Sequence, residues 1–421
     1  MDKIVIEGPT RLKGTVEVSG AKNSALPIMA ATLLTDEKCI IKKVPALRDV
    51  NTMVKILRNL GVKVQFDGGR MVIEPKGYRN HIAPYKYVKE MRASFCVLGP
   101  ILAKHKRAQV SYPGGCAIGN RPVDLHLKGI KALGAEIKIE HGYVIAETKQ
   151  LKGAHVYLGG SFGSSVLATD NVMMAAALAK GRTVIENAAC EPEVVDLADF
   201  LIDMGAKIKG AGTPLIEING VKKLGGAEHE VIPDRIEAGT FMIAAAITKG
   251  DITVKGARYD HLGALVDKLQ DAGVTVTRHG KDIRVRTCRH LKPVDITTLP
   301  YPGFPTDLQA QMMALVSVID GISVITEKIY PDRFMHVSEL ARMGAQVKLE
   351  GDSAIVKGIK QLSGAPVMAS DLRASAALVL AGMAARGKTD VSRVYHLDRG
   401  YDRIEMKLSQ MGANIRREKE E

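Results

Sequence analysis

The chain has 421 residues, 46% hydrophobic and 25% charged, which is typical of a globular protein of two or three domains. This composition excludes a disordered, collagenous or coiled-coil protein. The formal net charge of +13 suits an anionic partner such as a nucleotide, a phosphate, a nucleic acid or an acidic membrane. A solvated basic surface with no partner is the alternative.

The cysteines and the first residues indicate a compartment. The chain has five cysteines, an odd number for a disulfide framework, and no two of them form a Cys-x-x-Cys pair. The first residues resemble a strand rather than a signal peptide. No apolar stretch approaches the roughly 20 residues that span a bilayer. We therefore expect a cytoplasmic protein without membrane insertion.

Taken in order, the chain opens with a strand at residues 2–15 and then repeats one pattern six times. Each repeat is predicted to run helix, strand, loop, helix, glycine, strand, strand. The glycine that ends the second helix recurs every 68 to 73 residues and suits a left-handed cap, at Gly61, Gly134, Gly205, Gly273, Gly344 and Gly412. The first helix of each repeat is apolar nearly all round, as at residues 240–248 and 374–385, so we expect it to be buried.

This repetition predicts the fold class, which is α/β: two inside-out α/β domains, each of three helix-strand-helix-strand units around buried helices. Six repeats exceed the usual size of one hydrophobic core, and the break is expected near residues 225–231. One domain then comprises residues 22–230. The other comprises residues 1–21 plus 231–421, because the opening strand has no partner to spare in the first half. The active site is expected in the cleft between the domains.

Polar residues at the starts of the buried helices should gather in space because the repeats are equivalent. Cations recur there, and free N–H groups at helix starts also attract anions. Two starts, Thr306-x-x-Gln309 and Asp234-x-x-Glu237, match the spacing of a capping box. Ordinary caps and salt-bridging charges are the alternative for any one of these residues. The set comprises Lys22, Asn23, Arg92, Ser165, Arg235, Asp307, Asp371 and Arg373.

A second candidate is the glycine-rich loop of the second repeat, at residues 112–122. Its glycines allow movement or close approach to a ligand, and Arg121 would lower the pKa of the Cys116 thiol. Cys116 could then act as an acid or a nucleophile, although a lone cysteine is more often inert. His126, ten residues further on, is expected on a helix surface.

Other chemistry finds no support in the sequence. There is no P-loop, no clear dinucleotide-binding fingerprint, no Gly-x-Ser-x-Gly elbow and no His-Glu-x-x-His pair. Aromatic residues do not alternate with basic ones, which argues against binding of nucleic acid. We expect no metal and no cofactor.

Several motifs in one order resemble the UDP-N-acetylglucosamine 1-carboxyvinyltransferases, a branch of the enolpyruvyl transferase family. The resemblance covers essentially the whole chain. It implies the two inside-out domains described above and the first committed step of peptidoglycan synthesis. The motifs are Gly20-Ala21-Lys22-Asn23, Arg92-Ala93-Ser94, Pro113-Gly114-Gly115-Cys116-Ala117-Ile118-Gly119-Asn120-Arg121-Pro122, Pro233-Asp234-Arg235, Phe304-Pro305-Thr306-Asp307, Asp332-Arg333-Phe334, Asp371-Leu372-Arg373 and Asp398-Arg399-Gly400.

The resemblance also implies the reaction and its residues. Enolpyruvate moves from phosphoenolpyruvate to the 3′-hydroxyl of UDP-N-acetylglucosamine by addition and elimination, and phosphate is released. Cys116 is then the general acid and the target of fosfomycin, Asp307 the base, and Lys22 a catalytic cation. Phosphoenolpyruvate would be held by Lys22, Arg92, Arg121, Arg333, Arg373 and Arg399. The amino sugar would contact Asn23, Asp307 and Ile329, and the UDP part Arg121, Pro122, Val123, Asp124, Leu125, Ser165 and Val166.

One departure and three alternatives remain at this point. The family often has Lys-Val-Ser-Val-Gly-Ala-Thr near the diphosphate, where this chain has Gly163 and Leu167 in place of the lysine and the glycine. The diphosphate is therefore expected to be held differently. The alternatives are the sister enzyme acting on shikimate 3-phosphate, a paralogue without catalysis, and a basic nucleic-acid-binding repeat protein.

Overall fold

The computed structural model describes residues 2–113, 123–287 and 290–420, and these form two compact units. Unit 1 contains the described residues of 2–19 and 233–420, and unit 2 contains those between 20 and 232. The chain passes from one unit to the other between residues 19 and 20 and again between residues 232 and 233. Each unit has its own hydrophobic core.

The described part of unit 2 contains three four-stranded sheets. Their strands are β3 (Cys39–Lys42), β4 (Lys63–Asp67), β5 (Arg70–Glu74), β6 (Ile82–Ala83), β7 (Arg107–Ser111), β8 (Glu136–Glu140), β9 (Tyr143–Glu147), β10 (His155–Tyr157), β13 (Arg182–Glu186), β14 (Lys207–Lys209), β15 (Leu215–Asn219) and β16 (Glu228–Glu230). They are ordered β16-β3-β5-β4, β6-β7-β9-β8 and β10-β13-β15-β14. A short pair, β11 (Gly159–Gly160) and β12 (Gly163–Ser164), stands apart from these sheets.

Unit 1 repeats the same plan. Its strands are β1 (Asp2–Gly8), β2 (Lys13–Glu17), β17 (Asp251–Lys255), β18 (Val274–His279), β19 (Asp282–Thr287), β20 (Ile296–Thr298), β21 (Ile322–Glu327), β22 (Gln346–Glu350), β23 (Ser353–Lys357), β24 (Pro366–Met368), β25 (Gly387–Ser392) and β26 (Ile415–Lys419). They are ordered β18-β19-β17-β2, β20-β21-β23-β22 and β24-β25-β1-β26. In each four-stranded sheet of either unit, one edge strand runs parallel to its neighbour and the other contacts are antiparallel.

The first strand completes the last repeat. In the other described four-stranded sheets, the edge strand farthest from the parallel pair is antiparallel to its neighbour. These two strands are consecutive in the chain, as β4 and β5 are. In the sixth sheet β1 lies between β25 and β26, with Ile4 opposite both Val391 and Arg417. The next strand, β2, runs parallel to β17. These pairings confirm the prediction that the opening strand pairs with the C-terminal half.

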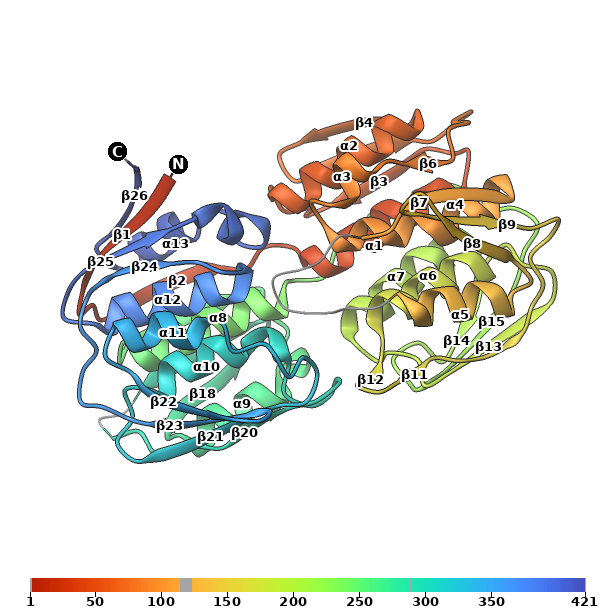
Figure 1. Ribbon diagram of the computed structural model, residues 1–421. Coiled ribbons are helices and arrows are strands. Elements are labelled where there is room, and N and C mark those ends of the chain that lie inside the picture. Colours follow the sequence, from red (N-terminus) through yellow and green to blue (C-terminus); the bar gives the residue numbers. More distant parts are fainter. Residues whose placement is uncertain (1, 114–122, 288–289, 421) are drawn as a thin grey trace. The chain divides into compact units, whose positions relative to one another are not determined.

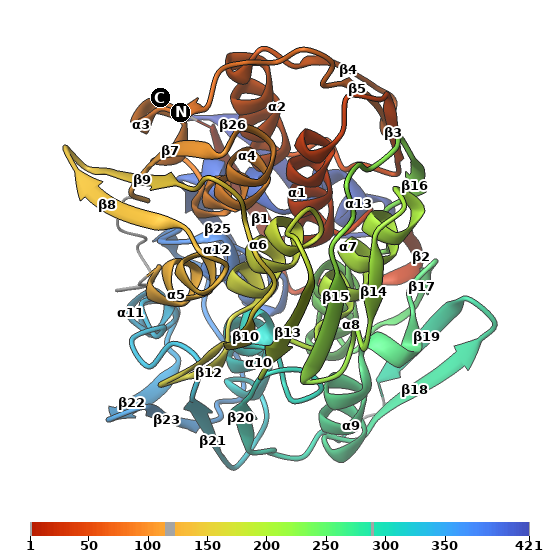
Figure 2. The same ribbon diagram turned by 90° about the vertical axis from the view of Figure 1, so that its right-hand side faces the viewer.

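One helix of each repeat lies inside its unit, and the sheets lie around these helices (Figures 1 and 2). Most residues of the inner helices are buried, as their apolar sequences predict. The inner helices are α1 (Lys22–Ala31), α4 (Leu98–His105) and α6 (Val166–Ala176) in unit 2, and α8 (Arg235–Ile247), α10 (Gln309–Val316) and α12 (Leu372–Ala384) in unit 1.

The second helix of each repeat buries one face only. These helices are α2 (Arg48–Leu60), α5 (Asp124–Ala132), α7 (Pro192–Asp203), α9 (Gly263–Asp271), α11 (His336–Arg342) and α13 (Ile404–Gln410). The short helices are α3 (Tyr85–Val88) and the 3₁₀ turns η1 (Thr32–Leu34), η2 (Arg92–Val97), η3 (Tyr259–His261), η4 (Thr306–Leu308) and η5 (Val394–Arg399). Within the described ranges, no helix is long and apolar enough to cross a membrane.

The six repeat glycines have the predicted left-handed conformation. Their φ angles lie between 88° and 102°, where a side chain would clash with the backbone. Each glycine therefore ends the second helix of its repeat and turns the chain into the next strand. The architecture is the predicted α/β repeat with helices inside and sheets outside.

Candidate active site

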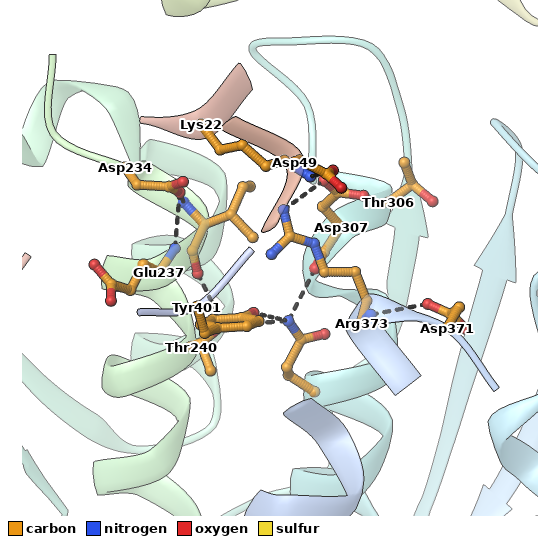
Figure 3. Close-up of polar contacts among 12 residues, drawn as sticks. Lys22, Asp49, Asp234, Glu237, Thr240, Thr306, Asp307, Asp371, Arg373 and Tyr401 are labelled. Carbon is orange, nitrogen blue, oxygen red and sulfur yellow. Dashed lines mark hydrogen bonds and ion pairs between the residues drawn. The ribbon is translucent and has the colours of Figure 1, made fainter. Parts of the chain in front are cut away.

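Asp307 lies at the start of the α10 segment, between two arginines. Its carboxylate accepts one hydrogen bond from Nη1 of Arg333 and one from Nη2 of Arg373, both 2.9 Å long. Figure 3 shows the contact with Arg373. The two arginine side chains are 6% and 3% exposed, whereas that of Asp307 is 27% exposed. The carboxylate is thus the accessible member of a buried charged group.

The surroundings of Asp307 act on its pKa in opposite directions. Burial raises the pKa, but the positive charges of Arg373 and Arg333 lower it more, so that it lies well below its usual range. Asp307 is therefore ionised at neutral pH. Both of its oxygens accept a hydrogen bond from an arginine, and these contacts make the carboxylate a weaker base than a free one.

A second network fixes the backbone of Asp307. Nε2 of Gln311, one turn into α10, donates to the carbonyl oxygen of Asp307 at 2.9 Å. The same amide lies 3.3 Å from the Tyr401 hydroxyl, which in turn lies 2.8 Å from Oγ1 of Thr240. Thr240 donates its proton to the carbonyl oxygen of Ile236 in α8, at 2.8 Å. These buried contacts join the starts of α8 and α10 (Figure 3).

The other expected residues of unit 1 lie near helix starts and strand ends. Arg373 is the second residue of α12, whose cap Asp371 accepts hydrogen bonds from the backbone N–H groups of Arg373 and Ala374. Ile329 is half-buried just after β21. Arg399, also half-buried, is the last residue of η5. Asp307, Arg333 and Arg373 are in direct contact.

In unit 2 the expected residues begin with α1. Lys22 and Asn23 are its first residues, and Nζ of Lys22 lies 3.2 Å from Oδ2 of Asp49 in α2. Both members of this ion pair are buried. Arg92 is the first residue of η2, which leads directly into α4. Helix starts thus carry the cations here too.

The residues expected to hold the UDP part belong to two other helix starts of unit 2. Val123 is buried and precedes α5, while Asp124 is exposed and Leu125 half-buried in its first turn. Ser165 caps α6 by accepting from the N–H of Ala168 at 3.4 Å, and Val166 follows it. Cys116, Arg121 and Pro122 lie outside the described residues.

Gly163 and Leu167, the two departures from the predicted pattern, lie in different elements. Gly163 belongs to β12, the short strand that precedes α6. Leu167, in the first turn of α6, is half-buried and packs against the core of unit 2. Leu167 therefore contributes apolar packing in the first turn of α6.

Three expectations from the sequence are wrong. Thr306 caps no helix, because its hydroxyl donates to Glu327, and α10 begins after a 3₁₀ turn that includes Thr306. Asp234 caps α8 as expected, but Glu237 does not close the capping box. Its carboxylate instead accepts from Lys407 and from the backbone N–H of Ser19.

The third wrong expectation concerns His126, which is buried rather than on a helix surface. Its Nδ1 lies 3.1 Å from Nδ2 of Asn171, and its ring meets that of Phe95 edge to face. Burial and, to a smaller extent, the charge of Arg92 lower the pKa of His126 to about 3. The ring is therefore neutral at physiological pH.

The sequence alone did not identify Asp49 and Gln311 as site residues. Asp49 pairs with Lys22, and Gln311 holds the backbone of Asp307. Both are polar residues on the buried side of a helix. A polar side chain at an apolar position of a helical pattern was the signal available in the sequence. The described residues contain no group of three or more His, Cys, Asp or Glu side chains placed to hold a metal ion.

Comparisons with known proteins identify relatives over the full length. The sequence model of the family described as EPSP synthase (3-phosphoshikimate 1-carboxyvinyltransferase) matches residues 6–408. A UDP-N-acetylglucosamine 1-carboxyvinyltransferase of Geobacter metallireducens is 57% identical over 420 residues, which cover 100% of both chains. A protein of the same name from Myxococcus xanthus is 57% identical over 422 residues, again covering 100% of both chains.

Solved structures support the fold alone. The enolpyruvyl transferase NikO from Streptomyces tendae has a TM-score of 0.90 at 24% identity and covers 100% of this chain and 99% of its own. EPSP synthase from Acinetobacter baumannii has a TM-score of 0.76 at 19% identity, with 100% of both chains covered.

A further polar cluster supports the first turn of α1, directly after Lys22 and Asn23. The Ser24 hydroxyl donates to Oδ2 of Asp196, which also accepts from the backbone N–H of Ile232 at 3.2 Å. Oδ1 of Asp196 lies 2.9 Å from Nε2 of His229, and Nδ1 of His229 lies 3.3 Å from Asp203. Burial lowers the pKa of His229, but the two carboxylates outweigh it, so the pKa is raised.

This raised pKa predicts a pH-dependent stability. A group with a raised folded-state pKa contributes stability below its unfolded pKa, about 6.5 for histidine, and loses it as pH rises through the folded pKa. We expect His229→Asn to lower the free energy of unfolding more at pH 6 than at pH 8.5. Urea unfolding of both proteins at the two pH values measures this, and an equal loss at both would contradict the ion pairs.

Proposed function

This chain belongs to the UDP-N-acetylglucosamine 1-carboxyvinyltransferase family, and we propose that it transfers enolpyruvate from phosphoenolpyruvate to the 3′-hydroxyl of UDP-N-acetylglucosamine and releases phosphate. The observation that carries the choice of reaction is the 57% identity over the full length to relatives of that name. The ionised carboxylate of Asp307 between two arginines supports the mechanism.

The reaction is an addition followed by an elimination. A proton adds to the methylene carbon of phosphoenolpyruvate, and the sugar oxygen forms a bond to the adjacent carbon while its own proton leaves. The resulting tetrahedral ketal then loses a proton from the methyl group as the carbon–oxygen bond to phosphate breaks. The enol ether product and inorganic phosphate result. The chain must therefore supply an acid, a base and cations for a phosphate and a carboxylate.

Asp307 is the base in this proposal. Its low pKa keeps the carboxylate ionised, so that it can accept a proton. The same low pKa makes it a weak base while both arginines are hydrogen bonded to it. An anionic substrate would compete for these arginines. Within the described residues, Nε and Nη1 of Arg373 are buried and have no hydrogen-bond partner, so two donors of this guanidinium are not taken up by Asp307 or by other described groups. Binding of phosphoenolpyruvate would thus raise the basicity of Asp307 when the sugar hydroxyl arrives.

The remaining roles follow the family pattern residue by residue. Cys116 is the acid, and Lys22 is a catalytic cation that also holds phosphoenolpyruvate with Arg92, Arg121, Arg333, Arg373 and Arg399. Asn23 and Ile329 contact the amino sugar. The UDP part is held by the residues from Arg121 to Leu125 with Ser165 and Val166. The proposed roles draw on residues of unit 1 and of unit 2.

We propose that this reaction serves peptidoglycan synthesis in the cytoplasm. Cys39, Cys96 and Cys190 are free thiols, which is typical of a reducing compartment. The alternative acceptor, shikimate 3-phosphate, has support from the family model, whose description names that substrate. The full-length relatives at 57% identity favour the amino sugar.

The proposal predicts the acceptor. Purified protein given phosphoenolpyruvate should release phosphate with UDP-N-acetylglucosamine and not with shikimate 3-phosphate. A coupled phosphate assay measures both reactions under one set of conditions. Release with shikimate 3-phosphate alone would overturn the acceptor, and release with neither would support a paralogue without catalysis.

The assignment of Cys116 predicts covalent modification by fosfomycin. The thiolate should open the epoxide ring and form a carbon–sulfur bond, with the proton going to the epoxide oxygen. Intact-protein and peptide mass spectrometry, with UDP-N-acetylglucosamine present, should place one adduct on Cys116. Cys116→Ser should carry none, and an unmodified wild-type protein would contradict the role of this loop.

A further inference from the structure

A buried glutamate that is not among the predicted site residues contacts Thr306, the residue before Asp307. Glu327 is the last residue of β21, and its side chain is fully buried on the same face of the strand as Ser323 and Ile325. A buried carboxylate is costly unless hydrogen bonds compensate for its lost hydration. The hydrogen bonds of Glu327 therefore show which groups compensate for its burial.

Both carboxylate oxygens of Glu327 accept hydrogen bonds. Oε1 accepts from the Thr298 hydroxyl at 2.6 Å and from the backbone N–H groups of Ile329 and Tyr330 at 2.9 and 3.0 Å. Oε2 accepts from the Thr306 hydroxyl at 2.9 Å. Glu327 thus ties the segment after β21, which leads to Arg333, to the turn that carries Asp307.

The direction of the hydrogen bonds through Thr306 is determined by its neighbours. Nη1 of Arg333 lies 2.9 Å from Oγ1 of Thr306, and a guanidinium can only donate. The Thr306 hydroxyl donates its single proton to Oε2 of Glu327, so its oxygen is left to accept from Arg333. The same Nη1 donates to Oδ1 of Asp307 at 2.9 Å.

We propose that Glu327 and Thr306 are positioning residues that hold the Arg333 guanidinium on Asp307 through a one-way hydrogen-bond relay. This inference rests on the proposed function, because it concerns how the proposed base is held. The relay runs from Arg333 to Thr306 to Glu327. Thr306 also keeps the buried Glu327 from drawing Arg333 into a direct ion pair, which would leave Asp307 with Arg373 alone.

The side chain of Thr306 is the point at which the relay can be broken without changing a charge. Thr306→Val preserves the shape but leaves Oε2 of Glu327 without its donor and removes one of the two acceptors of Nη1 of Arg333, a loss that buried partners do not recover from water. Thr306→Ser retains the hydroxyl. Thr326→Val is the matched control, because Thr326 lies in the same strand as Glu327 and its hydroxyl contacts only Ser353 among the described side chains.

The test measures steady-state phosphate release for the four proteins. We expect Thr306→Val to lower kcat roughly 10- to 100-fold, because the loss of Asp307 orientation outweighs its higher basicity. The KM for UDP-N-acetylglucosamine should change less than about threefold. Thr306→Ser and Thr326→Val should stay within about threefold of wild type in both constants. Equal kcat for Thr306→Val and wild type, or equal damage in the serine and valine variants, would overturn the relay. Glu327→Gln, which keeps the side-chain size, should lower kcat in the same sense if the valine variant does not fold.

A second readout separates the relay from the proposed function. Carbon-13 NMR of labelled aspartate carboxyls, with the Asp307 signal assigned from Asp307→Asn, reports the titration of Asp307 without turnover. Thr306→Val should shift this titration to higher pH than in wild type and in Thr306→Ser, since Arg333 no longer holds the carboxylate. An unchanged titration would refute the relay even if the wild-type enzyme is active. A shifted titration in a protein that releases no phosphate would support the relay and refute the proposed function.

Discussion

The candidate site of unit 1 depends on one shared carboxylate. Asp307 is paired with Arg333 and Arg373, whose side chains are almost completely buried. Neither buried guanidinium would be stable there without a negative partner, and removing one member of a buried pair is far more costly than forming it is favourable. The segments that carry these groups must therefore be held at fixed positions. The buried contacts of Gln311, Tyr401 and Thr240 do this for the backbone.

The repeated architecture explains how such a group can be assembled from distant parts of the chain. Three inner helices share one core in each unit, so their starts carry residues that the sequence separates by about one repeat. In unit 1, Asp307 precedes α10 and Arg373 begins α12. The strand β1 closes the last sheet of this unit and links the two ends of the chain through β26. Unit 1 therefore contains both the pairing of the first and last strands and the group around Asp307.

Much of this fold follows from local sequence patterns, while the polar contacts do not. The apolar helices, the left-handed glycines and the pairing of β1 depend on periodicity and on counting repeats. The partners of Thr306 and Glu237 depend on residues far away in the sequence, so the capping-box spacing was misleading at both. Glu327 did leave a signal, because alternation along β21 places it on the buried face with Ile325. What that carboxylate binds could be seen only from the packed structure.

The most direct test of the account is the turnover of Asp307→Asn. This change keeps the size of the side chain and removes both its charge and its basicity. Measured as phosphate release with saturating phosphoenolpyruvate and UDP-N-acetylglucosamine, kcat should fall about 10²- to 10⁴-fold, the range for loss of a general base. Calorimetry should show that the folded variant still binds UDP-N-acetylglucosamine. A kcat within a few-fold of wild type would contradict the central role of the carboxylate that the two arginines hold.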